Sequence, residues 1–246
     1  MTTTTNADRF RILDSLRVSK LERSRYCASL TIPSVLPPEG WNEQVQLPQP
    51  YSSVAARGVT AMASRMLSAL LPLNDTPFFR FELSSGMEPE MEIYSYLNNL
   101  SYQVYNKISS GYLRESIYQI LQHLIVVGDV MVILEDDMNI RLIRIDRFVV
   151  RRDVNGDINE IIYKEYETID EDLDNQDILF SSSLDPDNRQ GYKALYTRLI
   201  KDREDVWKSV TEDTEGKVSN TGEFAVPNFI VLRWASIAGE NYGRSH

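Results

Sequence analysis

The chain has 246 residues, of which 42% are hydrophobic and 25% are charged, so it can bury the core of one large domain or two small ones. Its net charge of −10 argues against a protein that grips DNA by neutralising phosphates, although it does not exclude one that DNA slides past. The single cysteine, Cys27, excludes an intrachain disulfide and a thiolate zinc site and is typical of a reducing compartment.

The first part of the sequence predicts helices. Asn6 or Asp8 can cap a first helix that runs to about Leu30, and the prolines of IPSVLPPEGW then interrupt the pattern. A second helix is predicted over roughly 52–71, where many Ala, Ser and Gly residues would let another backbone approach closely. Its predicted apolar face consists of Val54, Met62, Met66, Leu67 and Leu70.

The segment 78–83, FFRFEL, is predicted as a short strand. A third helix is expected to begin near Glu88, and Gly111 separates it from a fourth. In the fourth helix apolar residues recur at helical spacing, namely Leu113, Ile117, Ile120, Leu121 and Leu124.

From Gly128 the period of the sequence changes to that of strands. Asn155-Gly156 predicts a hairpin with a type I′ turn. The predicted strands contain DVMVIL, IRLIRI, FVVRRD, INEIIYKEY, YKALYTRLI, DVWKSV and NFIVLRW. The expected fold class is therefore α+β, with N-terminal helices packed on a mostly antiparallel sheet.

The predicted parts are a helical part over 1–127, a β-rich part over 128–237 and a turn over 238–246. The longest apolar run, LIVVGDVMVIL, is too short to cross a bilayer and contains Asp129, so a soluble protein is expected.

The run AGENYGRSH at 238–246 resembles a phosphate-binding loop only superficially. Gly239 and Gly243 are too close together, and Arg244 stands where the lysine of such a loop belongs. DVNGDINE likewise fails the spacing of a calcium loop, so the hairpin is the better interpretation. No cofactor site is predicted.

Acidic residues offer one further hypothesis. Glu135, Asp136, Asp137 and Asp146 could hold a hard cation, although acids at strand ends are more often a solvated edge. His123 lies on an apolar helix face and is interpreted as a core or interface histidine. No nucleophile with an adjacent base is visible, so no catalytic residue is predicted.

Four segments, TIPSVLPPEG, QPYSSVAARGVTAMASRMLSALLP, IVVGDVMVILED and ASIAGENYGRSH, follow one another along the chain. Together they resemble the portal, or head-to-tail connector, proteins of T7-like podoviruses. QPYSSVAARGVTAMASRMLSALLP is similar to the family's proline-aromatic opening followed by Ala-Arg-Gly, which falls on 56–58 here. ASIAGENYGRSH is similar to its downstream Gly-Glu-x-Tyr-Gly-Arg-Ser stretch. TIPSVLPPEG and IVVGDVMVILED fall where the family has similar segments, so the resemblance covers almost the whole chain in order.

The resemblance implies a structural ring protein, usually dodecameric, at one capsid vertex. Double-stranded DNA would pass through its channel without sequence specificity, driven by a separate packaging ATPase that binds transiently. The other implied partners are the tail adaptor, capsid, scaffold and internal core proteins, with no membrane. The protein would be made in the host bacterial cytoplasm and reside in the virion.

Members of that family are about twice as long, so the resemblance implies that this chain is their N-terminal wing region. The run 238–246 would then be the turn that launches a stem helix. Two other classes stay open: an α+β binding module unrelated to phages, and a metal-dependent enzyme using the acids above. The residues expected at a subunit interface or at the stem junction are Arg57, Gly58, Gly239, Glu240, Tyr242, Gly243 and Arg244.

Arg57 is interpreted either as a residue that pairs across a subunit boundary or as an ordinary exposed arginine. Glu240 and Arg244 stand four residues apart, in the order that favours a pair on a helix. For these two, a local pair is favoured slightly over a bridge between subunits.

Overall fold

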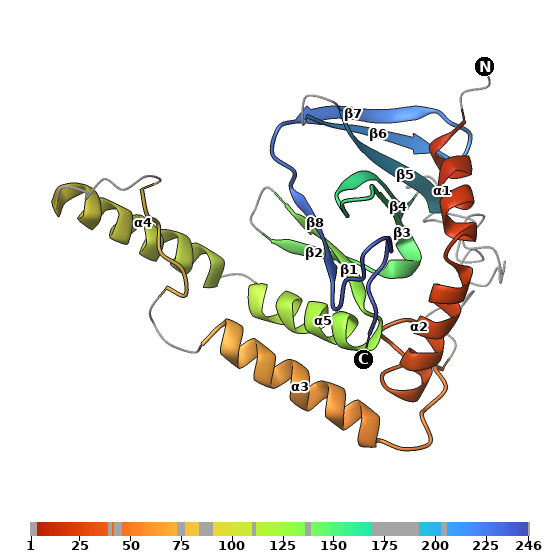
Figure 1. Cartoon of the computed structure of the whole chain (residues 1–246), viewed down its shortest axis with the longest axis horizontal. Coiled ribbons are helices and arrows are strands. Elements are labelled where there is room, and N and C mark those ends of the chain that lie inside the picture. The colour runs from red at the N-terminus through yellow and green to blue at the C-terminus, as the bar shows by residue number, and fades with distance from the viewer. Residues whose placement is uncertain are drawn as a thin grey trace.

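The computed structural model describes residues 4–38, 41, 46–72, 77–83, 91–109, 112–135, 139–168, 192–202 and 206–245. Its helices are α1 (Asn6–Ser15), α2 (Val18–Leu30), α3 (Val54–Leu70), α4 (Met91–Ser109) and α5 (Leu113–Val126). Its strands are β1 (Asp129–Leu134), β2 (Ile140–Ile143), β3 (Phe148–Arg152), β4 (Ile158–Thr168), β5 (Tyr192–Lys201), β6 (Trp207–Asp213), β7 (Val218–Phe224) and β8 (Phe229–Arg233), with a 3-10 turn, η1 (Ile145–Arg147), before β3. Helices precede strands, which confirms the predicted α+β class (Figure 1).

The described strands form two sheets in which every neighbouring pair is antiparallel. One sheet has the order β2-β1-β8, and the other has the order β3-β4-β5-β6-β7. Met131 in the central strand β1 pairs with Ile143 of β2 on one side and Val231 of β8 on the other. Because β8 follows the five-stranded sheet in sequence yet pairs with β1, the two sheets form one folding unit.

The main core lies between the sheets and α5. Met131, Phe148 and Ile161 are fully buried in it. Trp207 and Phe229 meet edge to face with 4.8 Å between ring centres and so join the two sheets. A second cluster, in which α1 covers the five-stranded sheet, consists of Ala7, Phe10, Leu13, Val149, Ile162, Ala194 and Tyr196.

An ion cluster also fixes α1 on this sheet. Glu160 of β4 binds Arg9 of α1 at 2.8 Å and Arg198 of β5 at 2.6 Å. Burial alone would raise the pKa of Glu160, but the two arginines outweigh burial and hold that pKa below its ordinary value.

The first predicted helix is in fact two helices, and its predicted cap is wrong. Thr5 is the N-cap, because its Oγ1 accepts a hydrogen bond from the backbone N–H of Asp8 at 3.1 Å. The side chain of Asn6 instead donates to backbone carbonyls of β5 and β6. The helix is interrupted at Leu16 and Arg17, where α1 ends and α2 begins.

The predicted hairpin between β3 and β4 is present, but its turn lies one residue earlier than predicted. The N–H of Gly156 donates to the carbonyl of Asp153, so Val154 and Asn155 are the central residues. Gly156 follows with φ +91°, as in a three-residue loop closed by glycine. The segment 213–217 has the same hydrogen bonds and leads into β7, a strand that the sequence did not predict.

The apolar face predicted for α3 is only partly correct. Val59 and Ala63 are buried, and Met66 and Leu67 pack against the core at helical spacing from them. The other three predicted members are exposed, namely Val54, Met62 and Leu70. The buried face is therefore displaced from the predicted one, and α3 packs on α5.

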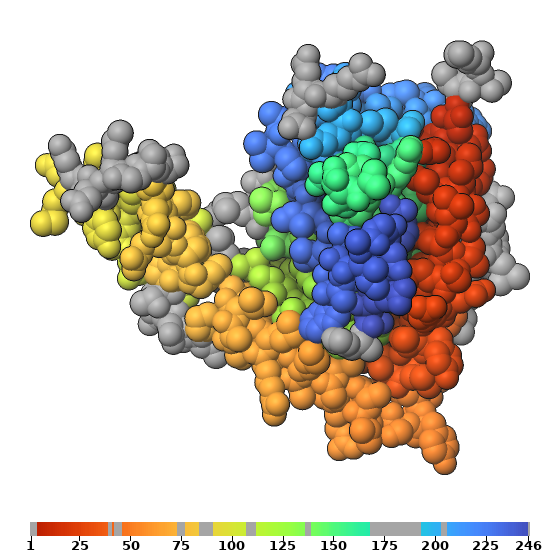
Figure 2. Space-filling model, viewed as in Figure 1, coloured from red at the N-terminus to blue at the C-terminus, as the bar shows by residue number. Residues whose placement is uncertain are grey.

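The segment 77–83 is extended but pairs with no described strand, so the predicted strand is wrong. It lies along α4 instead, where the N–H of Phe81 donates to Oγ of Ser101 at 3.3 Å. Figures 1 and 2 show that α4 extends away from the sheets, on the side of the molecule opposite α1 and α2.

Candidate functional site

The residues predicted for a functional site lie in two places. Arg57 and Gly58 are on α3, whereas the other five are in the C-terminal loop, which we define as residues 235–245. The loop begins just beyond β8 and folds back on itself, because the N–H of Arg244 donates to the carbonyl of Ala235 at 3.0 Å. Gly239 turns it with φ +82°.

A buried ion pair holds the end of the loop. The carboxylate of Asp129, at the start of β1, is 1% exposed. Its Oδ1 accepts a hydrogen bond from the N–H of Gly243 at 2.7 Å, and its Oδ2 lies 3.0 Å from Nζ of Lys20 on α2. Lys20 also donates to the carbonyls of Gly243, at 2.6 Å, and Val127, at 2.9 Å. One ammonium group thus ties together α2, β1 and the loop.

The electrostatic balance at Asp129 is dominated by burial. Burial raises the pKa of Asp129, and the nearby charge of Lys20 opposes that rise. Removing one member of such a pair would strand the other charge in the interior, which is costly. The pair therefore makes the position of the loop depend on both side chains.

Two glycines permit the close approach of backbones at this point. A Cβ on Gly243 would lie 2.9 Å from the carbonyl oxygen of Gly128 and 2.9 Å from Cβ of Arg233. A Cβ on Gly128, which has φ +92°, would lie 2.6 Å from the backbone nitrogen of Ser245. Both contacts are shorter than a real Cβ tolerates, so the loop can seat here only with glycine at both positions.

The loop also covers the free edge of β3. The N–H of Val150 donates to the hydroxyl oxygen of Tyr242 at 3.1 Å, and the N–H of Arg152 donates to Oδ1 of Asn241 at 2.8 Å. These N–H groups are two residues apart on the outer edge of the sheet, where none of the described strands pairs with them. Burial raises the pKa of Tyr242 above its ordinary value, so its hydroxyl stays protonated at neutral pH.

Arg17 completes the contact between the helices and the loop. Its guanidinium lies 5.5 Å from the ring centre of Tyr242, a cation–π distance. It also pairs with Asp14 at 2.7 Å and donates to the carbonyl of Ile145. Neither Arg17, Lys20 nor Asp129 was predicted as a site residue.

Glu240 and Arg244 form the local pair that was favoured, with Nη2 of Arg244 2.6 Å from Oε1 of Glu240. The pair spans a turn rather than a helix, because residues 238–245 are not helical. Both side chains are exposed, so the pair contributes little to stability.

On α3, Arg57 is exposed and makes no side-chain hydrogen bond or ion pair with any described residue. A Cβ on Gly58 would meet nothing within 4 Å. This stretch of α3 is therefore free surface, separate from the C-terminal loop.

The described acidic residues of the predicted cation site form ion pairs with arginines. Glu135 pairs with Arg141 at 2.9 Å, Asp146 pairs with Arg144 at 2.9 Å, and Asp136 and Asp137 lie outside the described residues. In the part of the chain that the structure describes, no three His, Cys, Asp or Glu side chains are grouped as metal ligands. Within the same ranges, no helix combines the length and the apolar character needed to span a membrane.

The sequence matches one protein family along nearly its whole length. The family described as bacteriophage head to tail connecting protein matches residues 3–246. The chain is 28% identical over 242 residues to the portal protein of Enterobacteria phage T3, covering 91% of this chain and 44% of that protein. It is 24% identical over 251 residues to the portal protein of Escherichia phage T7, covering 91% and 45%.

A third relative, the portal protein of Enterobacteria phage SP6, is 23% identical over 249 residues, with 91% of this chain and 45% of that protein covered. The chain thus spans less than half the length of the relatives it matches. The family match extends through the helices, both sheets and the C-terminal loop. This chain belongs to the bacteriophage head to tail connecting protein family.

Proposed function

We propose that this chain is the wing region of a phage portal subunit, which assembles into a ring at one capsid vertex. The match of residues 3–246 to the connector family carries this proposal. Three relatives that each cover 91% of the chain bear the name portal protein. In this role the ring passes double-stranded DNA during packaging and ejection and carries the tail.

The proposed role is structural rather than catalytic. The described acids that could have served a metal-dependent enzyme are each paired with an arginine. The net charge of −10 suits a ring that must let DNA phosphates pass without holding them. The proposed partners are further copies of the subunit, the tail adaptor, the capsid, scaffold and internal core proteins and, transiently, the packaging ATPase.

Within the subunit, we propose that the C-terminal loop is the junction at which the wing meets a stem helix. Gly239, Glu240, Tyr242, Gly243 and Arg244 all lie in this loop. Its anchorage to Asp129, Lys20 and β3 would fix the direction in which a stem leaves the wing. A junction that transmits load needs such fixed geometry.

Electron microscopy of the purified protein, together with mass spectrometry of every chain in the preparation, tests the proposal. We expect rings with a central hole, in a dodecameric or similar cyclic symmetry. A compact monomer that forms no ring, even when tail and capsid proteins are added, would refute the portal assignment. The mass measurement also shows which chains complete each subunit.

A further inference from the structure

A cavity of about 500 Å³ opens where β8 meets the hairpin between β3 and β4. The buried rings of Trp207 and Phe229, which contact each other edge to face, form part of its wall. Ile158 and the exposed Ile230 add further apolar surface. Cavities of about 300–1,000 Å³ that combine an apolar lining with a few polar groups are typical of sites for small ligands. This cavity therefore has room for the apolar part of a ligand.

Arg152, at the end of β3, supplies a polar group to the same lining. Its Nε donates to the carbonyl of Asn241 at 3.1 Å, and its Nη1 donates to the carbonyl of Gly156 at 2.9 Å. Its Nη2 is buried and has no hydrogen-bond partner among the described residues. A buried donor without an acceptor is costly. An acceptor in the cavity would satisfy this donor once the guanidinium turns toward it.

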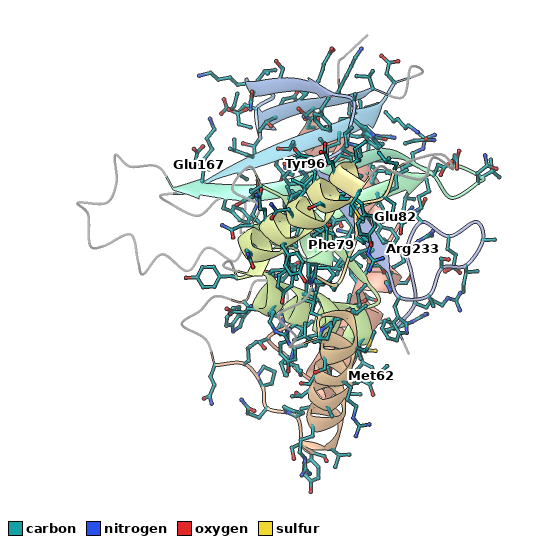
Figure 3. The ribbon with its side chains drawn as sticks, turned by 90° about the vertical axis from the view of Figure 1, so that its left-hand side faces the viewer. Met62, Phe79, Glu82, Tyr96, Glu167 and Arg233 are labelled. Carbon is teal, nitrogen blue, oxygen red and sulfur yellow. The ribbon has the colours of Figure 1, made fainter. Side chains whose placement is uncertain are left out.

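A second arginine stands close to Arg152. Nη1 of Arg233 donates to the carbonyl of Glu240 at 3.0 Å, and Figure 3 shows Arg233 beside the C-terminal loop. A Cβ built on Gly156 would lie 3.8 Å from Nη2 of Arg233, so both guanidinium groups adjoin this glycine. Burial, followed by the charge of Arg233, lowers the pKa of Arg152. The two positive charges therefore oppose each other at this point.

Within the described ranges, neither arginine forms an ion pair. Asp129 and Asp157 offset part of the charge of Arg152 from a distance. The carboxylate of Asp129 is already bound by Lys20 and by the N–H of Gly243, and Asp157 is exposed. Lys201 also lines the cavity but has an interaction of its own. The two arginines thus lack a close counter-ion, and an anion in the cavity would supply one.

We infer that the cavity binds a carboxylate that is attached to an apolar group. Arg152 holds the carboxylate, and the rings of Trp207 and Phe229 contact the apolar group. A guanidinium matches a carboxylate in shape and charge, whereas the apolar wall disfavours a strongly hydrated ion such as free phosphate. The ligand is either a free organic acid or the terminal residue of a polypeptide, since both present this combination. Such binding does not depend on the formation of a ring.

Titration of the purified chain with 3-phenylpropanoate tests the site, with tryptophan fluorescence as the signal because Trp207 lines the cavity. The uncharged 3-phenylpropanamide is the matched probe without a carboxylate, and sodium phosphate is the anion without an apolar group. We expect the acid to bind at least about tenfold more tightly than the amide, because charge-assisted hydrogen bonds are strong. Acetyl-Gly-Phe with a free carboxylate distinguishes the two sources. If it binds more tightly than 3-phenylpropanoate, the ligand is a polypeptide terminus; otherwise it is a free organic acid.

Arg152→Gln should weaken the binding of 3-phenylpropanoate at least about tenfold. The matched control is Arg151→Gln, which removes an exposed neighbouring arginine that does not line the cavity. Arg152 also holds the C-terminal loop, so a second variant is needed that leaves both arginines in place. Ala225→Trp fills the cavity from an exposed position on its lining. Circular dichroism checks that each variant is folded.

Equal affinities for the acid and the amide would overturn the inference. Binding that is unchanged in folded Arg152→Gln or Ala225→Trp would also overturn it, and Ala225→Trp alone decides if Arg152→Gln does not fold. Phosphate binding as tight as that of the acid would overturn it as well, because the apolar wall would then play no part. All of these outcomes leave the portal assignment untouched, since that assignment depends on the ring.

Discussion

His123 should make the fold sensitive to mild acid. It is 8% exposed on α5, and its Nδ1 has no hydrogen-bond partner among the described residues. Burial, with a smaller contribution from the charge of Arg144 and against the opposing charge of Asp146, lowers its pKa to about 4. In the unfolded chain the pKa returns to its ordinary value near 6.5. Between these values the unfolded chain binds a proton that the folded protein does not, so stability is lost as pH falls.

The size of this loss follows from the two pKa values. Lowering the pH from 7 to 5 should cost about 2 kcal/mol of unfolding free energy through His123 alone. The assay is urea denaturation followed by tryptophan fluorescence at both pH values and at one protein concentration. His246→Gln, in every protein compared, leaves His123 as the only histidine. His123→Leu should remove about 2 kcal/mol of the pH dependence, and equal losses with and without His123 would refute the reasoning.

Three further predictions concern stability and assembly. Gly128→Ala should lower the unfolding free energy by about 3 kcal/mol, because Gly128 has a positive φ and an added Cβ would collide with the loop. Gly58→Ala should raise the unfolding free energy by up to about 1 kcal/mol, because alanine favours the helix and its Cβ would meet nothing. Urea titration measures both changes, and equal effects would contradict the argument. Glu160→Gln should lower the unfolding free energy by about 2 kcal/mol at pH 7 and by less in acid, because the stabilisation by the carboxylate is lost as pH falls through its lowered pKa. Thermal unfolding of both proteins at several pH values measures this, and a difference that does not change with pH would contradict it. Arg57→Glu, if Arg57 is an interface residue, should keep the circular dichroism of the folded protein yet abolish rings in the electron microscope, and intact rings would contradict that role.

Periodicity predicted most of this fold because most elements bury one face. The strand β1 contains a continuous apolar run, and β3 and β5 also bury apolar side chains in the core. β7 escaped prediction because its sequence, VSNTGEF, is mostly polar and exposed; it is defined by backbone pairing with β6, and only Phe224 packs against the core. A signal was nevertheless present: DTEGK at 213–217 repeats the turn pattern of DVNGD at 153–157, and each turn begins a new strand.

The opposite error occurred at FFRFEL. An aromatic run favours a strand, but this segment pairs with none of the described strands, and Phe78 packs against Phe79 and Tyr105 of α4 instead. Tertiary context thus overrode local preference. The same holds for α3, whose buried face was decided by its contact with α5 rather than by its largest side chains.

The candidate site was only half visible in the sequence. The family resemblance pointed to the loop residues, including Tyr242 and Gly243, but not to what holds them. Asp129 gave a signal, since a carboxylate inside a continuous apolar run must be paired when buried. Its partner Lys20 lies more than a hundred residues away in the sequence. The helix of Lys20 carries several other charged residues, and no local sequence pattern distinguishes Lys20 from them.

The unpredicted interruption between α1 and α2 places an exposed side chain next to a buried one that contacts the C-terminal loop. In a continuous helix, two consecutive side chains point about 100° apart, so they need not lie on opposite faces. Here the break separates them sharply: Leu16 is 78% exposed, whereas Arg17 is 2% exposed and contacts Tyr242 of the C-terminal loop. Arg17 thus joins the interruption between the two helices to the C-terminal loop, so the turn between α1 and α2 helps to fix the position of Tyr242.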